Sequence, residues 1–346
     1  MNYIVLDLEW NQCPGGKEKE NPDIPFEIIE IGAVRMDEQF HILDSFGERI
    51  RPQIYHHLHY RTRQILKVNL KDFNKARKFP AVIRDFLKWC GEDFIFATWG
   101  PMDLDYLQNN MDYYKIPQTL PKPLFYYDVQ KLFSLFHEDG KTRRALKYAV
   151  DYLNLPKELP FHCAADDAYY TAQVLSGMDT KEAIIYCSVD YHRPPSCRPE
   201  EIYLHFPQYS KYVSMTYNNK EDIMTDRMVT VTPCHECGRS LRKKIRWFTS
   251  NNSTYYCLAV CAEHGFKQGK IRIKKTDSNQ YFAIRTTKMI SEEKAASIRQ
   301  KQEQLRMKRK IRRSRTTGTY TPPAGSVNIS ISPTAVDKRL RNKRKS

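Results

Sequence analysis

The chain opens with the run Tyr3-Ile4-Val5-Leu6-Asp7-Leu8-Glu9-Trp10, in which two acidic residues interrupt an apolar segment. The apolar and β-branched residues predict a buried strand, and residues two apart on a strand point to the same face of a sheet. Asp7 and Glu9 should therefore project together. Burying two neighbouring anions is costly unless a proton or a cation compensates them, so a divalent metal is expected here. The alternative is a solvated pair on an edge strand.

The pattern that follows predicts the fold class. Two further strands, over 26–36 and 40–50, can form an antiparallel meander with the first. Strands are then expected over 94–98 and 124–129, and helices over 81–90, 103–111, 130–136, 142–153 and 164–178. This order predicts an α/β domain over 1–178, with a mixed sheet flanked by helices.

Two later acidic residues lie on the apolar side of their predicted helices. Asp103 precedes an apolar helical stripe, whereas Asp105 aligns with polar residues. In the last helix Asp167 borders the buried face, whereas Asp166 aligns with the polar side, and His162 lies on the loop that enters this helix. A single aspartate at a helix start is usually only a cap, and a single histidine in a loop usually has no special role.

Together these residues meet the needs of phosphodiester hydrolysis by two metal ions. Four carboxylates, Asp7, Glu9, Asp103 and Asp167, supply the oxygen ligands that two Mg²⁺ or Mn²⁺ ions require. Histidine titrates near neutral pH, so His162 is the candidate general base for the attacking water.

The ordered set Asp7-x-Glu9, Asp103 and His162-x4-Asp167 resembles the DEDDh family of 3′-5′ exonucleases. The resemblance covers roughly the first 180 residues. It implies a ribonuclease H-like fold, metal binding by the four carboxylates, His162 as general base, and release of 5′-mononucleotides from a free 3′ end.

Trp10 departs from the pattern of many members, which have threonine after the glutamate of the first motif. This variant is similar to the ribonuclease T-like branch of RNA 3′-processing exonucleases, so single-stranded nucleic acid, with RNA favoured over DNA, is the expected substrate. Trp10 is a candidate to bind the substrate by stacking on the terminal base, and the alternative is that it packs in the core.

Two near copies of one motif predict a second metal site. Cys234-x2-Cys237-Gly and Cys261-x2-His264-Gly have the spacing of a zinc ribbon with a Cys3His site, and Cys257 is the rival ligand. A structural Zn²⁺ is expected to fold a small domain over 228–287. Its basic residues and Trp247 suit single-stranded nucleic acid, although a solvated basic face or a docking site for a protein partner are the alternatives.

Charge is concentrated at the end of the chain. Residues 294–346 contain 16 Lys and Arg against two acidic residues, and so account for +14 of the net charge of +16. We expect a basic tail over 288–346 that is disordered when free, although a charged helical pattern extends to Arg315. Residues 179–227, with several prolines, are expected to be an irregular linker.

Composition limits both the expected cellular compartment and the class of function. Nine cysteines without a signal peptide favour the cytoplasm over an extracellular disulfide framework, and no apolar run is long enough to span a membrane. The rival to an enzyme is a non-catalytic factor that binds nucleic acid or protein and uses the exonuclease fold as a scaffold. The complete acidic set argues against this rival, because a scaffold does not need buried carboxylates.

Overall fold

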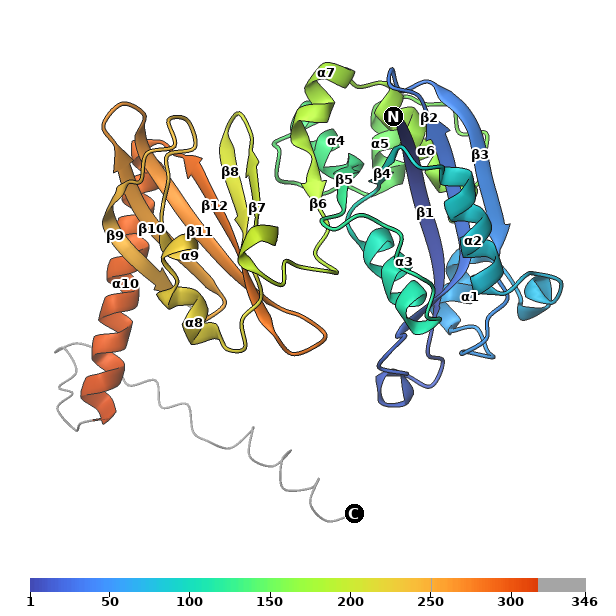
Figure 1. The fold of residues 1–346 in the computed structure, drawn as a ribbon, viewed down its shortest axis with the longest axis horizontal. Helices are drawn as coiled ribbons and strands as arrows, with labels where there is room; N and C mark the ends of the chain where they lie inside the picture. The colour runs from blue at the N-terminus through green and yellow to red at the C-terminus, as the bar shows by residue number, and fades with distance from the viewer. Residues whose placement is uncertain (250, 317–346) are drawn as a thin grey trace, which may run out of the picture. The chain divides into compact units, whose positions relative to one another are not determined.

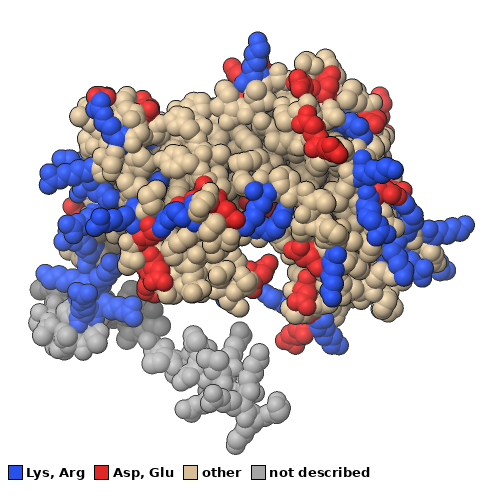
Figure 2. Space-filling view, in the orientation of Figure 1, with Lys and Arg blue, Asp and Glu red and all other residues tan. Residues whose placement is uncertain are grey.

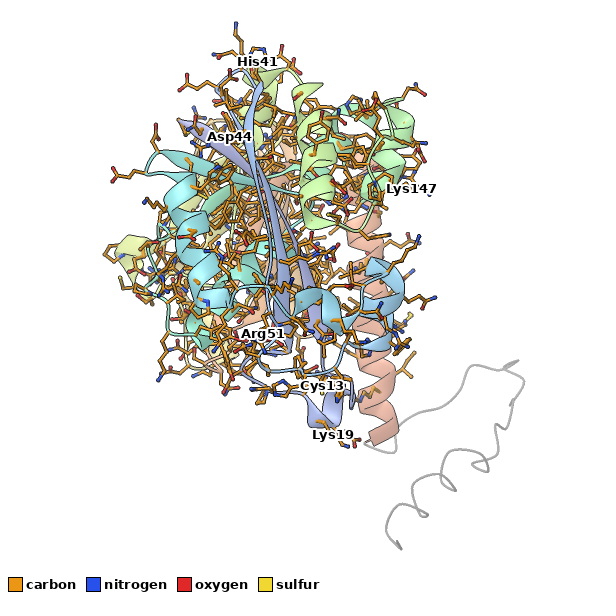
Figure 3. The ribbon with its side chains drawn as sticks, turned by 90° about the vertical axis from the view of Figure 1, so that its right-hand side faces the viewer. Cys13, Lys19, His41, Asp44, Arg51 and Lys147 are labelled. Carbon is orange, nitrogen blue, oxygen red and sulfur yellow. The ribbon has the colours of Figure 1, made fainter. Side chains whose placement is uncertain are left out.

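Strand β1 (Asn2–Gln12), which carries Asp7 and Glu9, is central in a six-stranded mixed sheet with the order β3-β2-β1-β4-β5-β6. The structure is a computed structural model, and it describes residues 1–249 and 251–316. The other strands are β2 (Phe26–Met36), β3 (Ile42–Arg49), β4 (Phe94–Thr98), β5 (Phe125–Asp128) and β6 (Ser188–Val189). The first three strands are antiparallel, and β4 and β5 continue parallel to β1. In Figure 3 the long strands run between the turn that carries His41 and the loop that carries Cys13 and Lys19.

Helices cover both faces of this sheet (Figure 1). They are α1 (Tyr60–Leu66), α2 (Phe79–Cys90), α3 (Met102–Tyr113), α4 (Val129–His137), α5 (Leu146–Tyr152), α6 (Ala164–Ser176) and α7 (Thr180–Ala183). Alternate residues of β1 divide between two cores: Tyr3 and Val5 pack with α4, α5 and α6, whereas Ile4 and Leu6 pack with α2 and α3. The predicted α/β class, with a mixed sheet flanked by helices, is thus confirmed. The alternation also places Asp7 and Glu9 on the side of α6.

A glycine on β2 allows α6 to approach the sheet. Gly32 pairs with Asp7 in the β1–β2 ladder. A β-carbon at Gly32 would lie 2.0 Å from the backbone carbon of Ala164, the first residue of α6. Any other residue at position 32 would therefore push the helix away. The close contact sets the height of Asp167 above β1.

His192 links helix α3 to the segment that follows β6 through contacts with two aspartates of the helix. Its Nδ1 lies 3.0 Å from Oδ1 of Asp105 and its Nε2 lies 2.9 Å from Oδ2 of Asp112. Burial lowers the pKa of His192, but the two carboxylates outweigh burial and raise the pKa to about 9. The imidazolium is therefore the form that holds α3, the helix that begins beside Asp103.

Stability should consequently decrease as the pH rises from 6.5, the ordinary pKa, through the folded value of about 9. The carboxylates are half exposed, so the loss should be only about 1 kcal/mol. Urea unfolding of the wild type and His192→Gln at both ends of this range measures the effect. An equal loss of unfolding free energy in both proteins would show that His192 does not titrate in this way.

The second sheet also has six strands, in the order β7-β8-β12-β11-β10-β9. These strands are β7 (Ile202–His205), β8 (Tyr209–Val213), β9 (Arg242–Thr249), β10 (Thr254–Cys261), β11 (Gly265–Lys275) and β12 (Tyr281–Met289). Helices α8 (Lys220–Thr225) and α9 (Arg227–Thr230) lead into β9. The Cys and His residues of the predicted zinc ribbon lie before β9 and around the β10–β11 turn.

Residues 179–227 are not an irregular linker as predicted. They contain α7, β6, β7, β8 and α8, with β6 paired to β5 of the first sheet and β8 paired to β12 of the second. The sequence pattern fails here because the strands have only two to five residues and are separated by prolines. Apart from the β7–β8 hairpin, the partners of these strands lie far along the chain, so local periodicity does not reveal them.

Residues Met1–Met289 form one compact unit, and a second unit begins at Ile290. The second unit contains α10 (Glu292–Thr316), so this part of the predicted tail is helical, as its charged pattern up to Arg315 indicated. Strong helix formers fill it, and the backbone N–H of Lys294 is capped by Ser291 Oγ. Figure 2 shows Lys and Arg gathered along it. The predicted tail residues 317–346 lie outside the described part, within which no helix has the length and apolarity for a membrane span.

Candidate active site and metal centre

Three of the predicted catalytic side chains converge at the contact between β1 and α6. Candidate ligand atoms of Glu9, His162 and Asp167 all lie within 4.8 Å of one another. Glu9 comes from β1, Asp167 from the first turn of α6, and His162 from the loop before that helix. Asp7 lies two residues before Glu9 on the same face of β1. The site is therefore built where Gly32 lets α6 touch the sheet.

Asp103 enters from the other side of β1. Strand β1 pairs with β4 only as far as Leu6. The backbone N–H of Leu8 points to the same side but lies beyond this pairing, so it needs another hydrogen-bond acceptor. Oδ1 of Asp103 accepts that N–H at 3.2 Å. The carboxylate is 6 % exposed at the start of α3 and is held beside the β1 acids. Asp105, on the same helix, instead contacts His192.

The loop before α6 is held at two points. The backbone N–H of His162 donates to Oδ2 of Asp167 at 3.2 Å, and His162 has a left-handed φ of 69°. The thiol of Cys163 donates to Oε1 of Glu30 at 3.2 Å. These contacts place the exposed imidazole of His162 over Glu9 and Asp167.

Glu30 is a fifth carboxylate of this site, and the sequence reasoning missed it. It pairs with Glu9 in the β1–β2 ladder and is 8 % exposed. The available signal was the one that marked Asp7 and Glu9, an acid inside the apolar run 26–36. Glu27 gives the same signal, yet it has a structural role, because it accepts the backbone N–H groups of residues 53–55.

The carboxylates oppose one another's ionisation. Burial raises the pKa of Glu9 to about 8, with further repulsion from Asp167, Glu30 and Asp103. Burial and the neighbouring acids, Asp103 and Asp167 foremost, also raise the pKa of Asp7 well above its ordinary value. For Asp167, burial raises the pKa to about 6 although the N–H of His162 opposes the change. Without a compensating cation, the site therefore favours protons over full ionisation.

An unpaired carboxylate oxygen also indicates that the site needs a compensating cation. Oδ1 of Asp167 is buried and has no hydrogen-bond partner among the described residues. Buried carboxylate oxygens without a partner are costly, and clustered ones are the ligands that Mg²⁺ and Mn²⁺ prefer. The four predicted carboxylates fit divalent metal ions on this ground, with Asp7, Glu9, Asp103 and Asp167 available to hold them.

Trp10 directly follows Glu9 on β1 and lies at the border of the site. Alternation along β1 places Trp10 on the α3 side of the sheet, as it does Leu6 and Leu8, and the β1–β2 register shifts between Glu9 and Trp10. Its ring packs edge-on against Tyr106 at 4.6 Å and lies 6.3 Å from Phe26. Trp10 remains partly exposed, so it both packs against aromatic neighbours and offers surface beside the carboxylates.

The second predicted metal site has the geometry of a tetrahedral centre. Candidate ligand atoms of Cys234, Cys237, Cys261 and His264 lie within 4.8 Å of one another. The sulfurs of Cys237 and Cys261 are 3.8 Å apart, and Nδ1 of His264 lies 3.7 Å from Cys234 Sγ and 3.5 Å from Cys261 Sγ. Usual zinc bond lengths in a tetrahedron give about 3.8 Å between two sulfurs and about 3.6 Å between sulfur and nitrogen.

The turns around these ligands favour thiolates. Gly238 and Gly265 follow the two pairs with φ of 70° and 66°, the conformation that closes each turn. Burial raises the pKa of Cys261, but the N–H groups of His264 and Glu263 outweigh burial and lower the pKa to about 6. Cys257 is not a ligand in this arrangement, since its sulfur is buried 3.5 Å from Thr232 Oγ1.

Comparisons with known proteins give matches over the part of the chain that carries the first site. Residues 4–175 match the family model described as Exonuclease. The probable 3′-5′ exonuclease KapD of Bacillus subtilis is 29% identical over 118 residues, which are 34% of this chain and 56% of that protein. The nuclease domain of 3′hExo, a DEDDh family member bound to rAMP, has a TM-score of 0.45 at 19% identity, covering 55% of this chain and 96% of that one.

A solved structure of exonuclease I from Escherichia coli in complex with an oligonucleotide has a TM-score of 0.45 at 10% identity, covering 75% of this chain and 54% of that one. The alignment with KapD spans only about half of that protein, whereas the family match covers β1 to α6 and includes every residue of the first site. Residues 4–175 of this chain therefore match the exonuclease family, and this match supports a nuclease.

Proposed function

We propose that this protein is a metal-dependent 3′-5′ exonuclease that hydrolyses single-stranded nucleic acid and releases 5′-mononucleotides. The observation that carries the proposal is the cluster of buried and partly buried carboxylates, including the unpaired Oδ1 of Asp167, next to an exposed histidine. We place RNA before DNA as the substrate because Trp10 follows the pattern of the RNA-processing branch. Similarity to KapD supports the 3′-5′ direction.

In this proposal Asp7, Glu9, Asp103 and Asp167 hold two Mg²⁺ or Mn²⁺ ions, which supply the positive charge that favours attack at phosphorus and departure of the 3′ oxygen. His162 takes the proton of the attacking water, and its left-handed backbone and N–H bond to Asp167 hold the imidazole over the carboxylates. Trp10 stacks on the terminal base from the partly exposed edge of the site.

Single strands labelled at either end test the proposal. We expect a 5′-labelled RNA to shorten stepwise with Mg²⁺ or Mn²⁺, and a 3′-labelled RNA to release its label at once as a mononucleotide. DNA of the same sequence measures sugar preference. Binding of these strands without shortening would instead support a non-catalytic nucleic-acid factor, and release of the 5′ label first would refute the direction.

We further propose that Cys234, Cys237, Cys261 and His264 hold one structural Zn²⁺. Four protein ligands complete the tetrahedron, so no position remains for a substrate or water. The site ties the segment before β9 to the β10–β11 turn, and we expect it to stabilise the second sheet rather than take part in hydrolysis.

Replacing Cys234 by serine should remove this metal. We expect the zinc content, measured by atomic emission on the purified protein, to fall from about one per chain to near zero, with a loss of several kcal/mol in unfolding free energy. Cys257→Ala is the matched control, because it removes a buried thiol of the same sheet and should retain zinc. Full zinc occupancy in Cys234→Ser would reject the ligand assignment.

A further inference from the structure

Within the unit Met1–Met289, a cavity of about 510 Å³ lies between the β5–α4 side of the first sheet and the β8–β12–β11 face of the second. Six cationic side chains line it, whereas Asp128 is the one carboxylate among its described lining residues. The cations are Lys131 and Arg143 from the first sheet's helices and loops, and Lys211, Lys270, Arg272 and Lys274 from the second sheet.

Strand register explains why four of these cations share a face. Lys270, Arg272 and Lys274 alternate along β11, so their side chains point to the same side. Lys270 pairs with Thr286 of β12, and Thr286 pairs with Lys211 of β8. The cations therefore form a row across three strands. Like charges in such neighbouring positions repel one another and destabilise the sheet.

The single carboxylate does not balance this charge. Asp128 caps helix α4 by accepting the N–H of Lys131 at 2.8 Å, and its other oxygen lies 3.7 Å from Arg143. The ammonium of Lys131 instead donates to the backbone oxygen of Tyr186 at 3.0 Å. Burial, followed by repulsion from Lys211, lowers the pKa of Lys131 to about 8. A cavity with this excess of cations has the electrostatics of a polyanion site.

Aromatic side chains lie among the cations. Tyr126, Tyr191 and Tyr209 also line the cavity. The ammonium of Lys274 sits 4.7 Å from the ring centre of Tyr191. Cations that follow a phosphate backbone and aromatic rings that stack on bases are the combination by which proteins bind single strands without sequence preference.

The cavity leads toward the candidate active site. Pro101, which precedes α3 and lies two residues before Asp103, lines it. A second cavity of about 420 Å³ shares Pro101, Tyr191 and Lys274 with the first and extends to Tyr106. Tyr106 contacts Trp10, the neighbour of Glu9. The two cavities thus share lining residues and reach Tyr106, next to Trp10, and the second cavity is also lined by Asp105, Asp190 and Asp277.

We propose that this basic groove, defined by Lys131, Arg143, Lys211, Lys270, Arg272 and Lys274, binds the phosphate backbone of a single strand upstream of its 3′ end. The role of the groove in hydrolysis rests on the proposed exonuclease function, whereas its affinity for a single strand does not. The second sheet then supplies substrate affinity, and the first sheet supplies the chemistry. Binding through the groove should favour long strands over short ones.

The test uses the triple variant Lys211→Gln, Lys270→Gln, Arg272→Gln, which removes charge with little change of size. Binding of a fluorescent single-stranded RNA of about 15 nucleotides, followed by anisotropy in the Asp7→Asn background, should weaken at least tenfold. The slope of log affinity against log salt should fall by about 2, since each lost phosphate contact contributes about 0.7. The matched control is Arg84→Gln, Lys147→Gln, Lys181→Gln, three exposed residues outside the groove, one of them labelled in Figure 3.

Hydrolysis assays distinguish a wrong assignment of the groove from a wrong assignment of the exonuclease function. In the active background, the wild type should cleave the long strand more efficiently than a dinucleotide, and the groove variant should lose that preference. Unchanged affinity and salt slope in a groove variant with wild-type zinc content and melting temperature would overturn the groove. Tight, groove-dependent binding without cleavage of either substrate would uphold the groove and refute the exonuclease proposal.

Discussion

Asp7→Asn is expected to lower the rate of mononucleotide release at least ~10³-fold, because loss of one carboxylate removes a metal ligand worth several kcal/mol of transition-state stabilisation. The side chain keeps its size, and Asp7 lies in the middle of β1 with its face packed against α6. The strand should therefore keep its position. Initial rates with saturating Mn²⁺ measure the effect, and Asp166→Asn is the matched control on α6.

The same substitution should stabilise the protein when metal is withheld. Burial and four neighbouring acids raise the pKa of Asp7, so its charged form destabilises the folded state near neutral pH. Asparagine removes that charge. We expect Asp7→Asn to melt at a higher temperature than the wild type in chelator, and added Mn²⁺ to stabilise the wild type more than the variant. Near wild-type activity, or a lower melting temperature in chelator, would contradict the assignment of Asp7.

Gly32→Ala should also have a large effect, although position 32 offers no side chain to a substrate. The new β-carbon would lie 2.0 Å from the backbone of Ala164, so α6 must move away from β2. Overpacking of this kind costs about 1–3 kcal/mol, and displacement of catalytic groups by about 1 Å costs roughly 10²-fold in rate. Chemical unfolding and initial rates measure the two effects.

Gly47→Ala provides the comparison for this variant. Gly47 pairs with Gly32 across β2 and β3, but a β-carbon there would meet only the side chain of Ala165, at 3.3 Å. The neighbour can yield by a few tenths of an ångström, so Gly47→Ala should lose less than half as much stability. If Gly32→Ala kept both the wild-type stability and the wild-type rate, the contact between α6 and the sheet would not position the site.

The sequence was most informative where local periodicity and burial coincide. The strands over 26–36 and 94–98 were predicted with the bounds that the structure has, because each is an apolar run between turns. The distinction between Asp103 and Asp105 also followed from helical periodicity, and the structure directs Asp103 to Leu8 and Asp105 to His192. The roles of these residues in catalysis remain predictions.

Local sequence patterns did not reveal the pairing of strands that lie far apart in the chain. Strands β7 and β8 are short, and they become part of a sheet only through β12, some 70 residues later in the chain. Glu30 was missed because its meaning depends on its cross-strand partner, Glu9. The basic groove was hidden for the same reason, since Lys131 and Lys211 come together only when both sheets have formed.

The central claim, that the acidic cluster is a divalent metal site, is tested most directly by anomalous X-ray diffraction from crystals grown with Mn²⁺. We predict anomalous peaks within about 2.0–2.6 Å of oxygens of Asp7, Glu9, Asp103 or Asp167, and their loss in Asp7→Asn. Manganese absent from these carboxylates in crystals of active protein, or bound there equally in Asp7→Asn, would contradict the account.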